Sequence, residues 1–210
     1  MSVDLRPRID RDSRREAILD VAAELFMDVG YSATSMSAIA ARVGGSKGTL
    51  YNYFKGKEDL FAACVERFCA EQQEVMDDLI VQAADVRSGL TALGRTLLVL
   101  AVTGFGQRNF TLIAAEAGRA PEIGRAFYEA GPQRGAAQVT RLIESASRSG
   151  QLRDCDAVVS AHQFIAMCQN RLFKARLCNY GPEPTEAEID AEVAAAVETF
   201  MAAFGPLPAT

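Results

Sequence analysis

The sequence has few of the residues on which metal sites and hydrolytic active sites depend. Its 210 residues include one histidine and no tryptophan. We identify no Gly-x-Ser-x-Gly nucleophile elbow, no phosphate-binding glycine loop and no Cys-x-x-Cys pair. A histidine cluster around a catalytic metal is excluded, because such a site takes several nitrogen ligands. We therefore expect a protein that is not an enzyme and that carries no metal and no cofactor.

The cysteines lack the pattern of a disulfide framework. Their number is odd, and they lie in apolar or amphipathic stretches, as Cys64, Cys69, Cys155, Cys168 and Cys178. Free cysteine is among the most buried residue types. We expect reduced thiols that fill space in the core, and a redox role is the alternative.

Long apolar runs are absent as well. The most apolar stretch, residues 90–105, is interrupted by Arg95 and by glycine. The opening residues MSVDLRPRIDRD form a polar arm with no apolar region behind the arginines, unlike a secretory signal. We expect a cytoplasmic protein with no membrane partner.

Acidic residues are in excess, but basic residues gather near the amino end. The formal net charge is −5, of which the first 55 residues contribute +1 and the remainder −6. The basic residues form two short groups: Arg6, Arg8, Arg11, Arg14 and Arg15, then Lys47, Lys55 and Lys57. Such groups are compatible with a DNA partner, whose phosphates attract local positive charge.

Helical periodicity runs through the whole chain. No segment alternates apolar and polar residues as a half-buried strand would, so the fold class is all-α. Capping residues, glycines and prolines delimit the segments. The expected helices cover residues 13–29, 35–43, 46–54, 57–83, 87–103, 107–118, 121–130, 133–149, 155–179 and 186–204.

Two short helices near the amino end are joined by a glycine turn. This spacing is typical of a helix-turn-helix, whose second helix enters the major groove of DNA. Leu50 and Phe54 face the core and leave one face of the second helix free. Lysines and hydroxyls there suit phosphates, while Thr49 or Asn52 can reach base edges.

The segment TSMSAIAARVGGSKGTLYNYFKGKEDLF resembles the signature of TetR-family transcriptional repressors. The resemblance implies a nine-helix architecture, with a DNA-binding head in residues 1–55 and a ligand-binding and dimerising body in residues 56–210. One departure is Gly45, where the family has a small aliphatic residue. The residues expected to contact an operator are Ser35, Ser37, Lys47, Gly48, Thr49, Tyr51, Asn52, Tyr53 and Lys57.

The resemblance also implies a homodimer formed by the last two helices of each subunit. Two heads that read a palindrome must be related by a two-fold axis. The last helix offers an apolar stripe that we expect at the dimer interface: Ile189, Val193, Val197, Phe200, Met201 and Phe204.

A ligand pocket is expected among the middle helices. Its candidate residues are Phe68, Leu97, Phe105, Phe110, Ile113, Phe127, Phe164, Met167, Cys168 and Arg171. Core packing is the alternative for each of them, since apolar residues at helical spacing normally fill a core. His162 is expected at the surface or in a structural role, with a hydrogen bond in the pocket as the alternative.

Together these features predict a ligand-responsive regulator of transcription. We expect a repressor that leaves a palindromic operator when a small, largely apolar effector binds the body. The alternatives are a redox-responsive regulator and a constitutive DNA-binding protein without a ligand.

Overall fold

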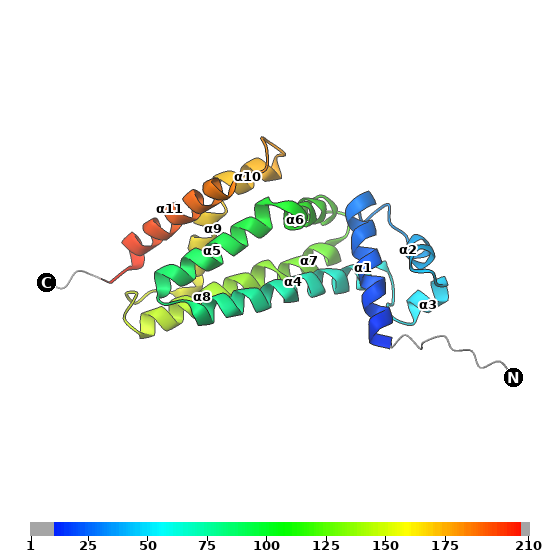
Figure 1. The fold of residues 1–210 in the computed structure, drawn as a ribbon, viewed down its shortest axis with the longest axis horizontal. Helices are drawn as coiled ribbons and strands as arrows, with labels where there is room; N and C mark the ends of the chain where they lie inside the picture. Colours follow the sequence, from blue (N-terminus) through cyan, green and yellow to red (C-terminus); the bar gives the residue numbers. More distant parts are fainter. Residues whose placement is uncertain (1–10, 207–210) are drawn as a thin grey trace.

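A computed structural model describes residues 11–206, apart from the side chain of Phe105 (Figure 1). Every regular element in this range is an α-helix. The helices are α1 (Arg11–Val29), α2 (Met36–Val43), α3 (Lys47–Tyr51), α4 (Lys57–Gln82), α5 (Val86–Val102), α6 (Gly104–Glu116), α7 (Pro121–Ala130), α8 (Pro132–Arg148), α9 (Ala157–Cys168), α10 (Arg171–Leu177) and α11 (Glu186–Phe204). Arg6 and Arg8 of the expected basic group lie outside the described residues.

The all-α class and the TetR-like arrangement are confirmed, with one difference in the body. Residues 155–179, expected as one helix, form α9 and α10 with a break at Gln169 and Asn170. Asn170 has φ −105° and ψ −93°, which is not helical. At the start of α10 the backbone N–H of Arg171 donates to the Glu192 carboxylate at 2.8 Å. A side chain of α11 thus satisfies a donor that the break leaves without a helical partner.

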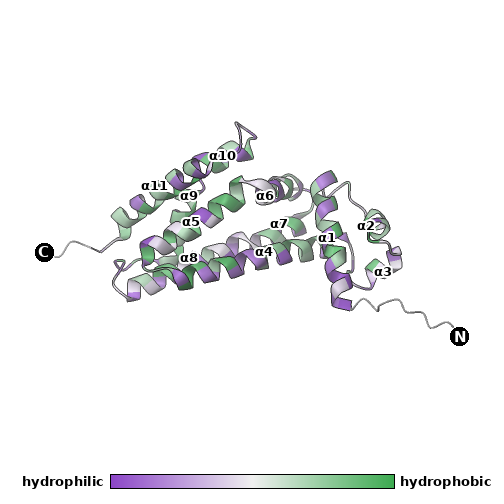
Figure 2. Cartoon of the chain, in the orientation of Figure 1, coloured by the Kyte–Doolittle hydropathy of each residue, from purple (hydrophilic) through white to green (hydrophobic). Residues whose placement is uncertain are grey.

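The molecule is elongated, with α1–α3, the head, at one end and α4–α11, the body, extending from it (Figure 1). The long helix α4 begins beside the head and runs through the body next to α7 and α8. Figure 2 shows hydrophobic and hydrophilic residues alternating along α4 and α8, as amphipathic helices require. The long helix therefore connects the two parts of the chain directly.

Two clusters of buried residues stabilise the fold. The body cluster contains the buried faces of α5, α8, α9 and α11. The head cluster contains Phe26, Ile39 and Leu50, and it continues into Ile113 of α6 and Ile123 of α7. The head is therefore packed on the body through an apolar junction. Because a close-packed interior transmits strain, displacement of one part changes the packing of the other.

Helix α11 packs on α5 and α9 within its own subunit. Arg95 of α5 is ion-paired with Asp190 at 2.9 Å and with Glu186. This packing differs from the expected placement of the α11 stripe. Of that stripe, Ile189, Val193, Val197 and Phe200 are at most 2% exposed, and Met201 and Phe204 are partly buried. The four fully buried side chains are not accessible to a partner, because they fill the core of the subunit.

A glycine allows α5, α9 and α11 to approach closely. A Cβ on Gly94 of α5 would lie 3.0 Å from Cys168 Sγ, 3.0 Å from the Phe164 ring and 3.3 Å from Val193 Cγ1. Such distances are shorter than ordinary van der Waals contacts. Phe164 and Cys168, two of the expected ligand residues, are here 0% exposed and pack against this glycine.

Candidate functional site

The segment from α2 to α3 has the local chemistry of two capped helices joined by a tight turn. The Ser35 hydroxyl accepts the Ala38 N–H at 3.1 Å at the start of α2, and the Ser46 hydroxyl accepts the Thr49 N–H at 3.1 Å at the start of α3. Gly44 ends α2 with φ +74°, a left-handed conformation that favours glycine. Both helices thus begin at a capping serine, and α2 ends at a glycine suited to the turn.

The outward face of α3 is free within the subunit. Lys47, Gly48 and Asn52 are exposed, and Tyr51 is 47% exposed, while Leu50 and Phe54 are buried in the head core. Of the other expected DNA contacts, Ser35 and Ser37 are exposed, and Thr49 and Tyr53 are half-buried.

Gly48 has room for a side chain. A Cβ there would meet only Ser46 Oγ, at 3.6 Å, which is an ordinary contact. The packing of the free protein therefore does not require glycine at this position. Glycine would be required if the backbone of α3 approached another molecule here, because the absence of a side chain lets the two come closer together.

Residues 44–48 also have the spacing Gly-x-Ser-x-Gly, which the sequence analysis did not recognise. In this chain the run lies between two helices, whereas a nucleophile elbow joins a strand to a helix. The Ser46 hydroxyl caps α3 and lies 2.9 Å from the Thr49 hydroxyl. The serine is therefore a helix cap, and the hydrogen-bond partners of its hydroxyl among residues 11–206 are the N–H and the hydroxyl of Thr49.

The start of α1 adds basic residues to this face, which the sequence analysis did not assign to the site. The guanidinium of Arg11 lies 6.0 Å from the centroid of the Tyr53 ring, and that of Arg15 lies 5.4 Å from the Phe54 ring. Arg14 fills the space beside Gly45, since a Cβ on that glycine would lie 3.1 Å from its Nη2. Arg11, Arg14 and Arg15 of the first basic group thus lie beside the segment that contains α3. The sequence feature that could have indicated these residues is the arginine-rich start of the first helix.

Lys57 lies at the joint between head and body. It is partly buried, and its Nζ donates to the carbonyl oxygen of Tyr31 at 3.0 Å. Its expected contact with an operator phosphate stays a prediction.

Polar contacts also join the head to the body. Arg67 of α4 is ion-paired at 2.9 Å with both Glu16 and Asp20 of α1. The hydroxyl of Ser32 donates to the carboxylate of Glu116, at the end of α6, at 2.5 Å. Both the first helix and the loop that precedes α2 are therefore fixed to helices of the body.

A cavity of about 190 Å³ lies in the body, lined by residues of α4, α5, α6, α7, α8 and α9 together with Gln169. Four of the expected ligand residues, Phe68, Leu97, Phe110 and Phe127, line it. Ile113 lies instead at the junction with the head, and Met167 and Arg171 line an open groove beside α11. His162, expected in a structural or surface role, is exposed and also lines the cavity.

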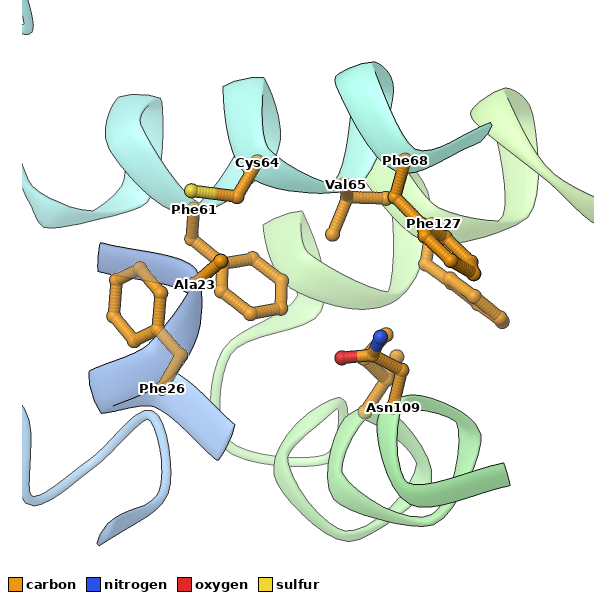
Figure 3. Close-up of a pocket in the computed structure, with 9 residues that line it drawn as sticks. Ala23, Phe26, Phe61, Cys64, Val65, Phe68, Asn109 and Phe127 are labelled. Carbon is orange, nitrogen blue, oxygen red and sulfur yellow. The ribbon is translucent and has the colours of Figure 1, made fainter. Parts of the chain in front are cut away.

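A second, much smaller void of about 20 Å³ lies at the junction of head and body (Figure 3). Phe26 of α1 and Phe61 of α4 line it on the head side. Phe68 and Phe127 line both this void and the body cavity. In Figure 3 the Phe68 side chain extends from α4 and the Phe127 side chain from α7, both at the same end of the void. These two rings therefore form a wall between the cavity and the aromatic core beneath the head.

The buried thiols are poorly suited to redox chemistry. Burial raises the pKa of Cys64 to about 12, that of Cys69 to about 11 and that of Cys168 to about 12. The thiolate is the reactive form of cysteine, so these groups are unreactive at neutral pH. All five cysteines are free, and only Cys178 is exposed.

Among the described residues, no group of three or more His, Cys, Asp or Glu side chains could hold a metal ion. No single helix in the same range is long and apolar enough to cross a membrane. Val86–Val102 and Gly106–Glu116 pass that test only as a pair, bent by 60°.

The exposed α3 face, its basic surroundings and the helical body behind it define a class of protein. The chain is a DNA-binding transcriptional regulator of the helix-turn-helix type. Comparisons with known proteins make the identification more specific. The model of bacterial regulatory proteins of the tetR family matches residues 18–64, and that of the AefR-like transcriptional repressor C-terminal domain matches residues 88–206. The chain belongs to the TetR family of transcriptional regulators.

Solved structures agree with this assignment over nearly the whole chain. A putative TetR-family transcriptional regulator from Mesorhizobium loti has a TM-score of 0.84 at 27% identity, covering 92% of this chain and 98% of that one. The flavonoid-responsive regulator FrrA has a TM-score of 0.75 at 29% identity, covering 93% of this chain and 98% of that one.

A curated relative matches over a shorter segment. The transcriptional activator FasR of Mycolicibacterium smegmatis is 45% identical over 60 residues, which are 29% of this chain and 27% of that protein. The chain thus spans about a quarter of that activator's length, and the activity of the whole activator is not transferred to this chain.

Proposed function

We propose that this protein is a ligand-responsive repressor that leaves its operator when a small, largely apolar molecule enters the body cavity. The observation that carries the proposal is the wall formed by Phe68 and Phe127, which separates the cavity from the aromatic core beneath the head. A ligand that displaces these rings changes the packing on which α1 rests. Binding at the two places is then coupled through a continuous packed core.

The proposed DNA contacts divide by chemistry. Lys47, Ser35 and Ser37 bind phosphates, and Asn52 and Thr49 contact base edges in the major groove. Tyr51 and Tyr53 position the backbone with their hydroxyls, and Lys57 stays a candidate for a phosphate. Gly48 permits close approach of α3 to the DNA.

The proposed active form is a homodimer built on α9 and α11. The outward side of these helices supports this choice. Val158 and Val159 of α9 are 54% and 51% exposed, and Ala191 and Ala195 of α11 line an open groove. Small side chains let helices of two subunits approach closely. Two-fold symmetry then presents two α3 helices to a palindromic operator.

The relatives support the remaining parts of the proposal. The family model that matches residues 88–206 describes a repressor, which favours repression over activation. FrrA is named as flavonoid-responsive, which favours a small organic effector. We place the protein in the cytoplasm, where a regulator meets its DNA, and assign it no catalytic activity.

The first test concerns the DNA-binding surface. A double-stranded operator is selected from random-sequence DNA, and its affinity is measured by fluorescence anisotropy at several salt concentrations. Lys47→Ala and Tyr53→Ala should each weaken binding, and Lys47→Ala should lower the salt slope by about one charge. Lys174→Ala, which removes the same charge from α10, is the matched control. Unaltered binding by the Lys47→Ala/Tyr53→Ala double variant contradicts the assignment.

The second test concerns the coupling. Phe127→Ala removes one of the two rings that separate the cavity from the junction, and it leaves the head surface unchanged. Operator affinity should persist, while release by a bound ligand should weaken, because the ring that transmits the displacement is missing. Full release in the variant would refute the proposed route.

A further inference from the structure

We infer that the body cavity selects an uncharged molecule that contains an aromatic ring and hydrogen-bonding groups, and that it discriminates against carboxylates and acyl-coenzyme A thioesters. This inference rests on the proposed function only in taking the cavity to be the effector site. It adds the chemical class of the effector.

The first argument is the absence of charge from the described cavity lining. No Asp, Glu, Lys or Arg is among the described residues that line it, and the only side chain there that can become cationic near neutral pH is the exposed His162. An ionised group buried without a partner loses its hydration and gains nothing in return. A carboxylate inside the cavity would therefore bind poorly.

Two ion pairs join α4 to α8 beside the cavity. Glu66 of α4 lies 3.6 Å from Arg134 of α8, and Asp77 of α4 lies 3.1 Å from Arg141 of α8. The Gln138 amide also donates to Asp77 at 3.0 Å, so this carboxylate has two partners. These pairs lie outside the cavity lining and leave its interior without an uncompensated charge.

The second argument is the aromatic lining. Phe68, Phe110, Phe127 and Tyr128 come from three different helices, and Phe110 meets Phe127 edge to face with ring centroids 5.7 Å apart. Aromatic rings favour edge-to-face and offset contacts with a further ring. The thioether of Met76 adds another group that packs well on ring edges.

The third argument is the polar part of the lining, which consists largely of amides. Gln72 and Gln73 of α4 and Gln169 after α9 line the cavity. Gln169 is oriented by its Nε2, which donates to the Leu97 carbonyl oxygen at 3.3 Å. A glutamine amide both donates and accepts hydrogen bonds, so it matches amides, phenols and ketones rather than ions.

The size of the cavity completes the argument. Its volume of about 190 Å³ exceeds the roughly 150 Å³ at which an apolar protein cavity binds benzene. One or two rings with small substituents fit this space. A nucleotide headgroup does not, and the described lining offers its phosphates no lysine or arginine.

The test uses two molecules of nearly equal shape and different charge. Calorimetry with the full-length protein measures the dissociation constants of 2-naphthamide, which is neutral, and 2-naphthoate, which is anionic at pH 7.5. We expect the amide to bind at least about tenfold more tightly, and palmitoyl-coenzyme A to show no binding. Equal or tighter binding of the naphthoate, binding of the thioester, or no binding of either naphthalene overturns the inference.

Three cavity variants and one control distinguish the hydrogen bonds of the glutamine amides from the contribution of apolar packing. Gln72→Leu and Gln169→Leu should each weaken naphthamide binding by about three- to tenfold, because a hydrogen bond in the cavity is lost. Gln82→Leu, at the exposed end of α4, should leave the affinity unchanged. Gln72→Lys should reverse the preference in favour of the naphthoate, and failure of all three cavity variants to alter selectivity contradicts the assigned roles.

A parallel measurement of operator binding separates this inference from the proposed function. If the naphthamide binds selectively but leaves operator affinity unchanged, the ligand class stands and the ligand-responsive mechanism fails. If the naphthoate binds preferentially and releases the operator, the mechanism stands and the ligand class fails.

Discussion

The ammonium of Lys57 lies 4.2 Å from the centroid of the Tyr31 ring and donates a hydrogen bond to the Tyr31 carbonyl oxygen. The ring itself is 5% exposed and lies 5.2 Å from Phe61, centroid to centroid. The first residue of α4 thus holds the loop between α1 and α2 by a cation–π contact and a hydrogen bond. A shift of α4 at this point moves the loop that leads into the DNA-reading helices.

The contact predicts a specific behaviour for Lys57→Met, which keeps most of the apolar stem and removes the charge. Loss of the cation–π contact and the hydrogen bond should lower the free energy of unfolding by about 1–2 kcal/mol. Operator affinity should fall, and the salt slope identifies the cause: an unchanged slope means that only the joint between head and body is weakened. Denaturant unfolding and anisotropy at several salt concentrations measure the two effects.

Lys55→Met is the matched control, since Lys55 is exposed just before α4. It should leave stability within about 0.5 kcal/mol of the parent protein. A salt slope reduced by about one charge in Lys57→Met would assign this lysine to a phosphate instead.

Gly48→Ala separates folding from DNA binding. The added methyl group has space in the free protein, since its nearest neighbour would be Ser46 Oγ at 3.6 Å. Alanine also favours helix over glycine by about 0.5–1 kcal/mol, so thermal stability should be kept or raised. Operator affinity should nevertheless fall by at least about tenfold, because the methyl group holds α3 away from the bases. Unchanged affinity in the stable variant would show that no close approach occurs there.

The arginines at the start of α1 should contribute to DNA affinity without contributing to its sequence preference. Arg11→Ala and Arg14→Ala should each reduce the salt slope of operator binding by about one and weaken binding to all sequences alike. Arg108→Ala, an exposed change in the body, is the control and should have no effect. Anisotropy titrations with the operator and with unrelated DNA make the comparison, and a selective loss on the operator alone would argue for base contacts.

Local patterns in the sequence predicted the head correctly. Caps at Ser35 and Ser46 and the turn at Gly44 depend on neighbouring residues only, so the pattern contains the relevant physics. The proximity of Arg11 to Tyr53 depends on how α1 crosses α3, which no local pattern encodes. That part of the surface therefore emerged only from the fold.

The body was predicted as helices around a ligand pocket, but which of the candidate residues line the cavity was predicted only in part, for a related reason. Phe164 and Phe127 are both aromatic residues at helical spacing, yet the first packs beside Gly94 and the second lines the cavity. Likewise, Val193 and Val197 form an apolar stripe that faces either a partner or the subunit's own core. Periodicity identifies the apolar side of a helix, whereas the neighbouring helix decides what covers it.

Gly94→Ala tests the close packing of α5 on α9 and α11. The Cβ would lie 3.0 Å from the Phe164 ring and from Cys168 Sγ, both within a fully buried core. Overpacking should reduce the free energy of unfolding by about 1–3 kcal/mol. Gly118→Ala is the control, since its Cβ would have no neighbour within 4 Å. Equal unfolding midpoints for the two variants would contradict the packing described.

The buried thiols should make stability fall in alkaline solution. Burial raises the pKa of Cys64 to about 12 from its usual value of 9.0, so the folded chain keeps a proton that the unfolded chain loses. The stabilisation is therefore complete below pH 9 and is lost as the pH rises toward 12, by up to about 1.4 kcal/mol per pH unit for one thiol. Chemical unfolding at pH 8, 9.5 and 10.5 measures this slope.

The variant Cys64→Ala should be less stable at pH 8, because a buried group is removed, and its stability should decline less steeply with pH. An identical decline in Cys64→Ala would mean that titration of tyrosine and lysine accounts for the whole loss of stability. Cys178→Ser, which changes the exposed thiol, is the control and should leave the slope of the parent protein unchanged.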